Sequence, residues 1–140
     1  MKFIFFTKTN WSESPRLRHQ LCDLVVDAGH DVMFFQKPGY PFSKIKFCKN
    51  PKKEIKLFTT LQLIHHKLRI FKILHRINAY FEKIQIMKVV RNETSTSSAI
   101  IINFNYDYYF IKDIFPSNKI ITIINDDSWS SALFNYQKPL

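Results

Sequence analysis

Residues 1–38, MKFIFFTKTNWSESPRLRHQLCDLVVDAGHDVMFFQKP, carry the pattern that decides the fold. Residues 2–7 hold a continuous apolar block of strand length, which is typical of a strand covered on both faces by helices. Apolar residues recur at helical spacing over residues 17–28, and Gly29 supplies a left-handed stop. A second short apolar strand follows at residues 32–35. Because such a crossover is right-handed, we expect two parallel strands with the first in the centre of a sheet.

The rest of the chain continues this alternation. Residues 55–59 predict a third strand, and residues 99–104 and 119–125 predict a fourth and a fifth that are apolar throughout and therefore buried on both faces. Between residue 61 and about residue 91 there is neither Gly nor Pro. This stretch predicts a long helix, or two in line, with a broad apolar stripe built from positions 61, 64, 68 and 71 and from positions 70, 73, 77, 80, 84 and 87.

Helix boundaries complete the assignment. Ser12 or Ser14 can cap the first helix, with Pro15 in its first turn. Residues 106–115 fit a short helix before Pro116, and a last helix follows residue 127. The predicted fold is α/β: one Rossmann-like domain over residues 1–140, with an open, mostly parallel sheet of about five strands and helices on both faces.

Composition narrows the class of protein. A chain of 140 residues that is 46% hydrophobic supports one folded domain, and no apolar run approaches the roughly 18 to 20 residues of a membrane span. We therefore expect a cytoplasmic protein. Cys22 and Cys48 form no CxxC pair, so buried reduced thiols are favoured over a disulfide or a metal site.

Several kinds of site are excluded by missing motifs. The chain has two glycines, Gly29 and Gly39, so neither a GxGxxG turn nor a P-loop can exist. There is no GxSxG or HExxH motif, and the adjacent His65 and His66 point in different directions on a helix. Receiver domains need acidic residues after the first strand, where this chain has Thr7-Lys8-Thr9. Dehydrogenase, kinase and receiver functions drop out, and no metal or cofactor is expected.

Ligands of such sheets bind outside the carboxyl ends of the strands, which directs attention to residues 7–18, 103–107 and 125–129. The first loop surrounds a helix amino terminus that favours an anion, and its candidate ligand-binding residues are Lys8, Asn10, Trp11, Glu13, Arg16, Arg18 and His19. Arg can hold phosphate bidentately, and a sugar can stack on a Trp ring. The plainer interpretation is a solvated first turn, with His19 as a surface or capping group. Asn103 and Asn125 either face the same crevice or form strand-end turns.

The segments that carry a family resemblance are residues 11–21 (WSESPRLRHQL), 28–32 (AGHDV) and 34–38 (FFQKP). Together they resemble the start of bacterial glycosyltransferases of the GT-B architecture that build surface polysaccharides. Segments 103–106 (NFNY) and 125–129 (NDDSW) are similar to the strand-end loops of that group, which face the cleft between its two domains.

The resemblance implies the acceptor-side half of such an enzyme. The enzyme moves a sugar from a nucleotide-sugar to a polysaccharide or lipid-linked acceptor without a metal, and a general base in the first domain deprotonates the acceptor hydroxyl. His19, Asp126 and Asp127 are the candidate bases, although either Asp can simply cap a helix. The carboxy-terminal, donor-binding domain has no counterpart in these 140 residues, so the expectation is that the isolated chain does not turn over a nucleotide-sugar.

Charge is concentrated in the middle of the chain. Residues 44–91 hold thirteen Lys and Arg against two acids, so this segment, at +11, carries the whole net charge of +10. A basic helix with an apolar face can lie on anionic lipid, and the candidate membrane-facing residues are Lys67, Arg69, Lys72 and Arg76. The alternative is a core helix with a solvated basic face.

Two other function classes stay open. A non-catalytic module that pairs with a separate donor-binding chain is consistent with the resemblance. A nucleic-acid-binding protein is consistent with the sequence pI of about 9.7, but no helix-turn-helix glycine turn, zinc spacing or RNP-like aromatic strand supports it, so no nucleic-acid partner is expected.

Overall fold

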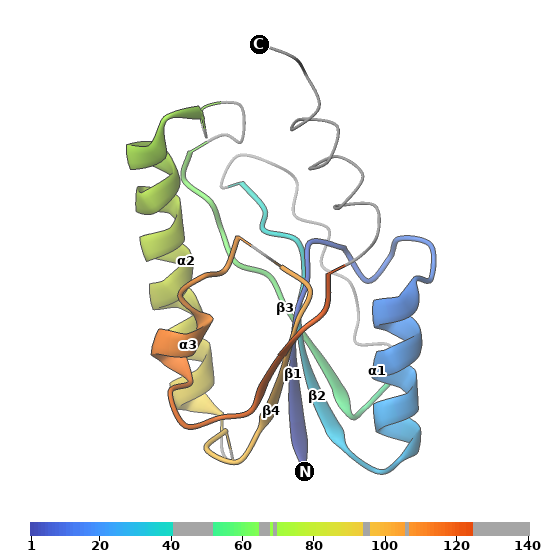
Figure 1. The fold of residues 1–140 in the computed structure, drawn as a ribbon. Coiled ribbons are helices and arrows are strands. Elements are labelled where there is room, and N and C mark those ends of the chain that lie inside the picture. The colour runs from blue at the N-terminus through green and yellow to red at the C-terminus, as the bar shows by residue number, and fades with distance from the viewer. Residues whose placement is uncertain (41–51, 65–67, 69, 94–95, 106, 125–140) are drawn as a thin grey trace, which may run out of the picture.

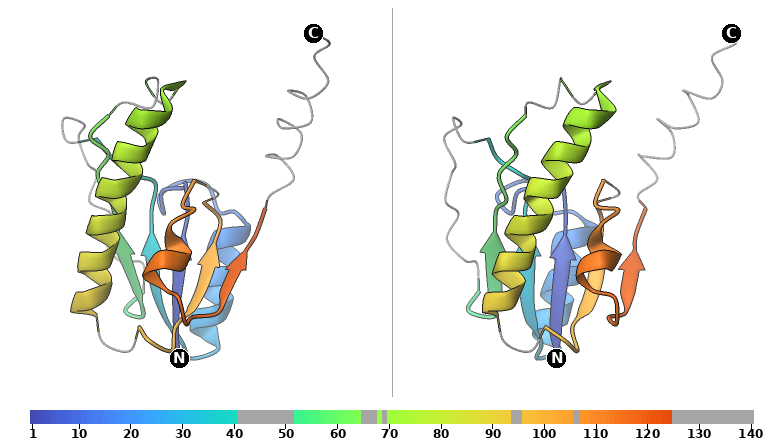
Figure 2. Two further views of the ribbon diagram at one scale, coloured as in Figure 1. Left: turned by 60° about the vertical axis from the view of Figure 1, so that its left-hand side comes forward. Right: turned by 90° about the vertical axis from the view of Figure 1, so that its left-hand side faces the viewer.

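The computed structural model describes residues 1–40, 52–64, 68, 70–93, 96–105 and 107–124 (Figure 1). The elements in chain order are β1 (Lys2–Phe6), α1 (Leu17–Asp27), β2 (Asp31–Phe35), β3 (Ile55–Phe58), α2 (Lys72–Asn92), β4 (Ile100–Asn103), α3 (Ile111–Ile114) and β5 (Ile120–Thr122). The strands form one parallel sheet in the order β3-β2-β1-β4-β5. Helix α1 covers one face, and α2 and α3 cover the other (Figure 2). The predicted α/β fold with a Rossmann-like open sheet is confirmed.

The first strand lies in the centre of the sheet, as its apolar run predicts. Phe5 contributes to the core under α1, together with Cys22 and Phe34. Ile4 and Phe6 contribute to the core under α2 and α3. Each of these side chains is fully or almost fully buried, because successive residues of a strand point to opposite faces and both faces are covered.

The prediction of a buried reduced thiol is confirmed for Cys22. Cys22 is a buried free thiol, and burial, followed by the charge of Asp23, raises its pKa to about 12. A thiol of this kind is inert at neutral pH. Cys48 lies outside the described residues.

Helix α1 begins later than predicted. Its amino-terminal cap is Arg16, and neither Ser12 nor Ser14 caps it. The reason is that residues 10–13 form a turn of their own, in which the Glu13 N–H donates to the Asn10 carbonyl at 3.1 Å. Nδ1 of His19 accepts the Arg16 N–H at 3.1 Å, which is the part that the third helical residue plays in a capping box. The helix ends as predicted, because Gly29 adopts a left-handed conformation with a φ of +85°.

The prediction of a helix from residue 61 is wrong, because α2 starts at Lys72. Residues 61–64 run beside the helix and are tied to it by two side-chain amides. Gln85 accepts the Leu61 N–H at 2.9 Å and donates to the Leu61 carbonyl at 2.8 Å. Asn78 accepts the Ile64 N–H at 3.0 Å and donates to the Ile64 carbonyl at 2.9 Å. These two amide clamps satisfy backbone groups that a helix would have paired internally.

The apolar stripe of α2 also lies on the other side from the one expected. Its members face solvent, with Ile73 at 73% exposure and Tyr80 at 62%. The buried side is instead made of Asn78, Ala79, Glu82, Ile86 and Val90. A helix of 21 residues is about 31 Å long, whereas the five residues of β1 span about 17 Å. The amino-terminal half of α2 therefore extends past the carboxyl ends of the strands, as Figure 2 shows, where polar side chains can line a pocket.

The last strand differs from its prediction as well. Residues 119–125 were expected to be buried on both faces, yet Ile121 of β5 is 40% exposed. Among the described residues, β5 pairs with β4 alone, so it is an edge strand with one side open.

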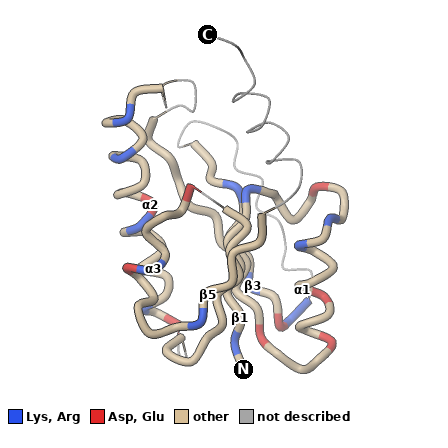
Figure 3. The backbone as a smooth tube through the Cα atoms, in the orientation of Figure 1, with Lys and Arg blue, Asp and Glu red and all other residues tan. Residues whose placement is uncertain are grey.

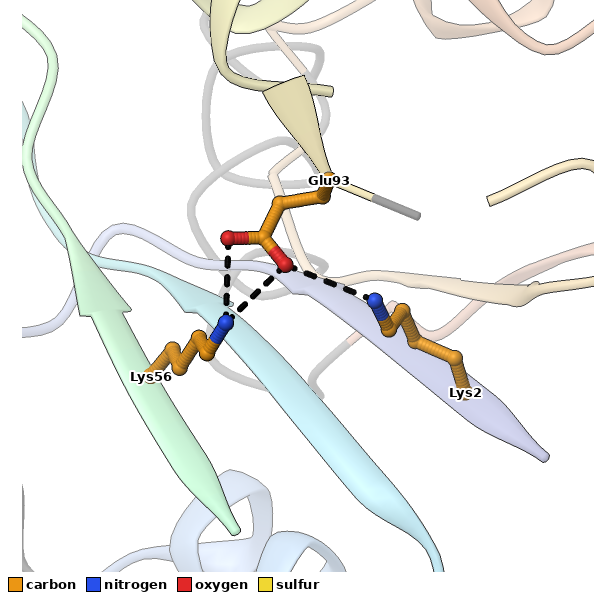
Figure 4. Close-up of polar contacts among 3 residues, drawn as sticks. All are labelled: Lys2, Lys56 and Glu93. Atoms are coloured by element: carbon orange, nitrogen blue, oxygen red, sulfur yellow. Dashed lines mark hydrogen bonds and ion pairs between the residues drawn. The ribbon is translucent and has the colours of Figure 1, made fainter. Parts of the chain in front are cut away.

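A charge cluster fixes the carboxyl end of α2 to the sheet. The Glu93 carboxylate lies 3.0 Å from Nζ of Lys56 on β3 and 3.5 Å from Nζ of Lys2 on β1 (Figure 4). Burial alone would raise the pKa of Glu93, but the hydrogen bonds and charges of Lys56 and Lys2 together bring it below its usual value of 4.5. The folded protein therefore favours the ionised form of this carboxylate.

This cluster makes stability depend on pH. Because the folded pKa of Glu93 lies below the unfolded one, its stabilisation is fully present above 4.5 and is lost as the pH falls through the folded pKa. We expect Glu93→Gln to lower the free energy of unfolding by about 1 kcal/mol at about pH 7 and by almost nothing in strong acid. Urea denaturation across the pH range measures this difference. Glu54→Gln, at an exposed carboxylate, is the control, and a Glu93→Gln effect independent of pH would contradict the prediction.

Candidate functional site

A pocket of about 290 Å³ lies where the strands end, on the side of the sheet that α2 covers. Residues that follow the four strands β1 to β4 form its floor, and the amino-terminal half of α2 forms its wall. Its polar lining consists of Lys8, Lys37, Tyr40, Gln62, His75, Asn78, Glu82, Asn105, Asp107 and Tyr108. The chain reverses direction across the sheet between β1 and β4, and ligands of open α/β sheets bind at such a point.

An ion pair spans the loops that follow β1 and β4. Nζ of Lys8 lies 2.5 Å from Oδ2 of Asp107, and both side chains are only partly exposed. The two loops lead to helices on opposite faces of the sheet, so this pair closes the gap between them. It presents a cation and a carboxylate side by side at the pocket.

A buried carboxylate lies deeper in the pocket. Glu82 is 2% exposed, and its Oε1 accepts the Nε2–H of Gln62 at 2.5 Å. Tyr108 is also buried, and its hydroxyl lies 3.4 Å from Oγ1 of Thr60. Burial, and next the negative charge of Glu82, raise the pKa of Tyr108 well above its usual value. Tyr108 therefore keeps its proton and remains a hydrogen-bond donor.

Two successive side-chain turns position the loop after β4. Oδ1 of Asn103 accepts the Asn105 N–H at 2.9 Å, and Oδ1 of Asn105 accepts the Asp107 N–H at 3.2 Å. These bonds place Asn105 and Asp107 at the pocket. Asn103 itself is buried and lines a second hollow, between β5 and α3.

The pocket has the chemistry to bind a neutral, hydroxyl-rich ligand. Carboxylates accept hydrogen bonds from hydroxyl groups, amides both donate and accept them, and a neutral tyrosine can do either. A buried carboxylate can also accept a proton from a bound hydroxyl. Within the described residues, no group of three or more His, Cys, Asp and Glu side chains could hold a metal ion.

Three of the first-loop candidates, Trp11, Arg18 and His19, lie on the other face of the sheet. The Trp11 ring packs edge-on against Phe34, with ring centres 5.0 Å apart, and against His19 at 4.9 Å. The Arg18 guanidinium lies 5.6 Å from the centre of the Phe104 ring. Arg18 and His19 are both buried, so they extend the core under α1. Nε2 of His19 has no hydrogen-bond partner in the described part of the chain.

Three other first-loop candidates are exposed, namely Asn10, Glu13 and Arg16. The Asn10 N–H donates to Oε1 of Glu13 at 3.1 Å, which serves the turn before α1, and Arg16 caps the helix. Of the predicted first-loop residues, Lys8 lines the pocket under α2, whereas the others and Asn103 do not.

Other predicted residues lie outside the described residues. Among the ligand and base candidates these are Asn125, Asp126 and Asp127, and among the membrane-facing candidates they are Lys67 and Arg69. The other two membrane-facing candidates, Lys72 and Arg76, are exposed on the first turns of α2.

Two of the three predicted loops, after β1 and β4, contribute to the pocket, and the third, residues 125–129, lies outside the described residues, but the wall of the pocket was not predicted. Lys8, Asn105 and Asp107 fall in loops that the parallel-sheet rule selects. Glu82 and Asn78 belong to a polar stripe at positions 75, 78, 82 and 85, which has the same helical spacing as the apolar stripe. That second stripe was the available signal, because a long helix with two opposed stripes can turn either one inward.

No family model, no curated protein and no solved structure matches this chain. The function of the pocket must therefore be inferred from the residues that line it. No helix among the described residues is long and apolar enough to cross a membrane.

The amide clamp at Asn78 holds the pocket wall in place, which a substitution can test. Asn78→Ala leaves the N–H and carbonyl of Ile64 without their partners, so we expect the free energy of unfolding to fall by about 2 kcal/mol. Thermal and urea denaturation measure the loss. Asn92→Ala, at an exposed position in the last turn of the same helix, should change stability by less than about 0.5 kcal/mol. Equal effects of the two substitutions would contradict a structural role for the clamp.

Proposed function

We propose that this chain is the acceptor-side domain of a glycosyltransferase and that the pocket under α2 binds the sugar of the acceptor. The observation that carries this proposal is the lining of the pocket, where buried Glu82, neutral Tyr108 and several amides meet at the carboxyl edge of a parallel sheet. A sugar presents hydroxyl groups that such a lining can bind as donors and as acceptors.

The family resemblance adds independent support. Its segments at residues 11–21, 28–32 and 34–38 cover the loop after β1, the first part of α1 and most of β2. In the group they resemble, the first domain holds the acceptor and a second domain holds the nucleotide-sugar. On this proposal the nucleotide-sugar reaches the pocket through a second domain or a separate chain.

The proposed reaction is an ordinary glycosyl transfer. The acceptor oxygen forms a bond to the anomeric carbon as the bond from that carbon to the nucleotide diphosphate breaks. A carboxylate accepts the hydroxyl proton in the same step. Within the described residues, Glu82 and Asp107 are the carboxylates that line the pocket, so they replace His19 as the leading candidates for the base. The ring of His19 is enclosed by Trp11 and Phe34 on the opposite face.

Nucleic-acid binding fits this pocket less well. The carboxylates of Glu82 and Asp107 offset the charges of Lys8 and Lys37 in the lining, and the cations of α2 lie on the outer side of the helix.

Ligand-observed NMR tests the proposal directly. Saturation transfer from the protein to a panel of free hexoses, N-acetylhexosamines and uronic acids should give signals for at least one class of sugar. We expect Glu82→Gln to weaken that binding by about tenfold, since a charged hydrogen bond to a sugar hydroxyl is lost.

Two comparisons make the experiment decisive. Glu54→Gln makes the same chemical change at an exposed site before β3 and should leave binding unchanged. Circular dichroism checks that both variants keep the fold. If no sugar binds, or if binding survives Glu82→Gln intact, the pocket is not the acceptor site.

A further inference from the structure

An apolar face runs along the outer side of α2, away from the sheet. Ile70 is 81% exposed and Ile73 is 73% exposed, and the same line continues through Ile77, Tyr80 and Ile84. In a folded protein a run of this length is unusual on a surface, because each exposed isoleucine forfeits the free energy of burial. The described part of the chain leaves this face open to solvent.

The apolar surface is broader than a seam for one partner helix. Phe71 and Phe81 flank the line and are 56% and 39% exposed. Leu63 and Leu68, which precede the helix, are exposed as well. A two-helix contact uses a narrow stripe, whereas the exposed apolar side chains here include residues before the helix as well as residues on it. Its breadth suits a flat partner better than a single helix.

The charges that border this surface are cationic. Lys72, Arg76, Lys88 and Arg91 are exposed on α2, and Lys83 lies 3.3 Å from Asp113 of α3. Figure 3 shows these basic positions distributed along the helix. The acid that α2 itself contains, Glu82, is buried on the opposite side. The outer face therefore combines apolar side chains with a positive border.

We propose that this face docks peripherally onto an anionic lipid surface. The isoleucines and aromatic rings insert at the boundary between headgroups and acyl chains, and the long Lys and Arg side chains reach the lipid phosphates. A second copy of the chain fits less well, because its own Arg76 and Lys88 would bring like charges together. This inference concerns the outer side of α2 and does not depend on what binds in the pocket.

Vesicle flotation tests the docking surface. The full chain should float with phosphatidylcholine vesicles that contain about one third phosphatidylglycerol, and much less with pure phosphatidylcholine. We expect the double substitution Ile73→Ser and Ile77→Ser to weaken binding by about tenfold or more, since two side chains lose their insertion. Arg76→Gln should weaken binding severalfold, and added salt should reduce it further.

Matched substitutions elsewhere on the surface distinguish binding through this face from nonspecific adsorption to vesicles. Leu24→Ser removes a side chain that is 66% exposed on α1, and Lys119→Gln removes an exposed cation before β5. Both should leave vesicle binding unchanged. Failure to bind anionic vesicles at low salt would overturn the proposal. So would binding that the double substitution leaves intact, or a concentration-dependent dimer that the double substitution dissociates.

Discussion

β1 pairs through its backbone with β2 on one side and with β4 on the other, and the positions of the helices and loops follow from this arrangement. The chain leaves β1 toward α1 on one face and leaves β4 toward α3 on the other face. The two loops therefore separate at the carboxyl edge, and Lys8 and Asp107 face each other across the gap. A candidate binding site exists here because neighbouring strands send the chain in opposite directions.

The sequence predicted the elements whose apolar residues are enclosed by the sheet and failed where a helix extends past it. A strand that is apolar throughout must be covered on both faces. The apolar run that includes Ile4, Phe5 and Phe6 therefore identified a central strand, and all three side chains are buried. Helix α2 has two opposed stripes, and periodicity alone does not say which one faces inward. The start of α2 was missed for a related reason. Residues 61–64 continue an apolar helical pattern, yet they are not helical, because the amides of Asn78 and Gln85, far along the chain, bind their backbone.

The two sides of α2 invert the usual arrangement of an amphipathic helix. Beyond the strand ends there is no sheet core for an isoleucine to contact, so the inner side of the helix is free to carry Asn78 and Glu82. The burial of these polar groups is tolerable because each has a partner, Ile64 for the amide and Gln62 for the carboxylate. Near its carboxyl end the same helix returns to ordinary packing, with Ile86 and Val90 against the sheet.

The amide clamps have a consequence for the rigidity of the pocket. Neither Asn78 nor Gln85 ionises at any pH that the protein survives, so the hydrogen bonds that fix the wall do not change with pH. The other end of the same helix differs, because the ion pairs of Glu93 that fix it to the sheet are lost as the pH falls through the folded pKa of that carboxylate.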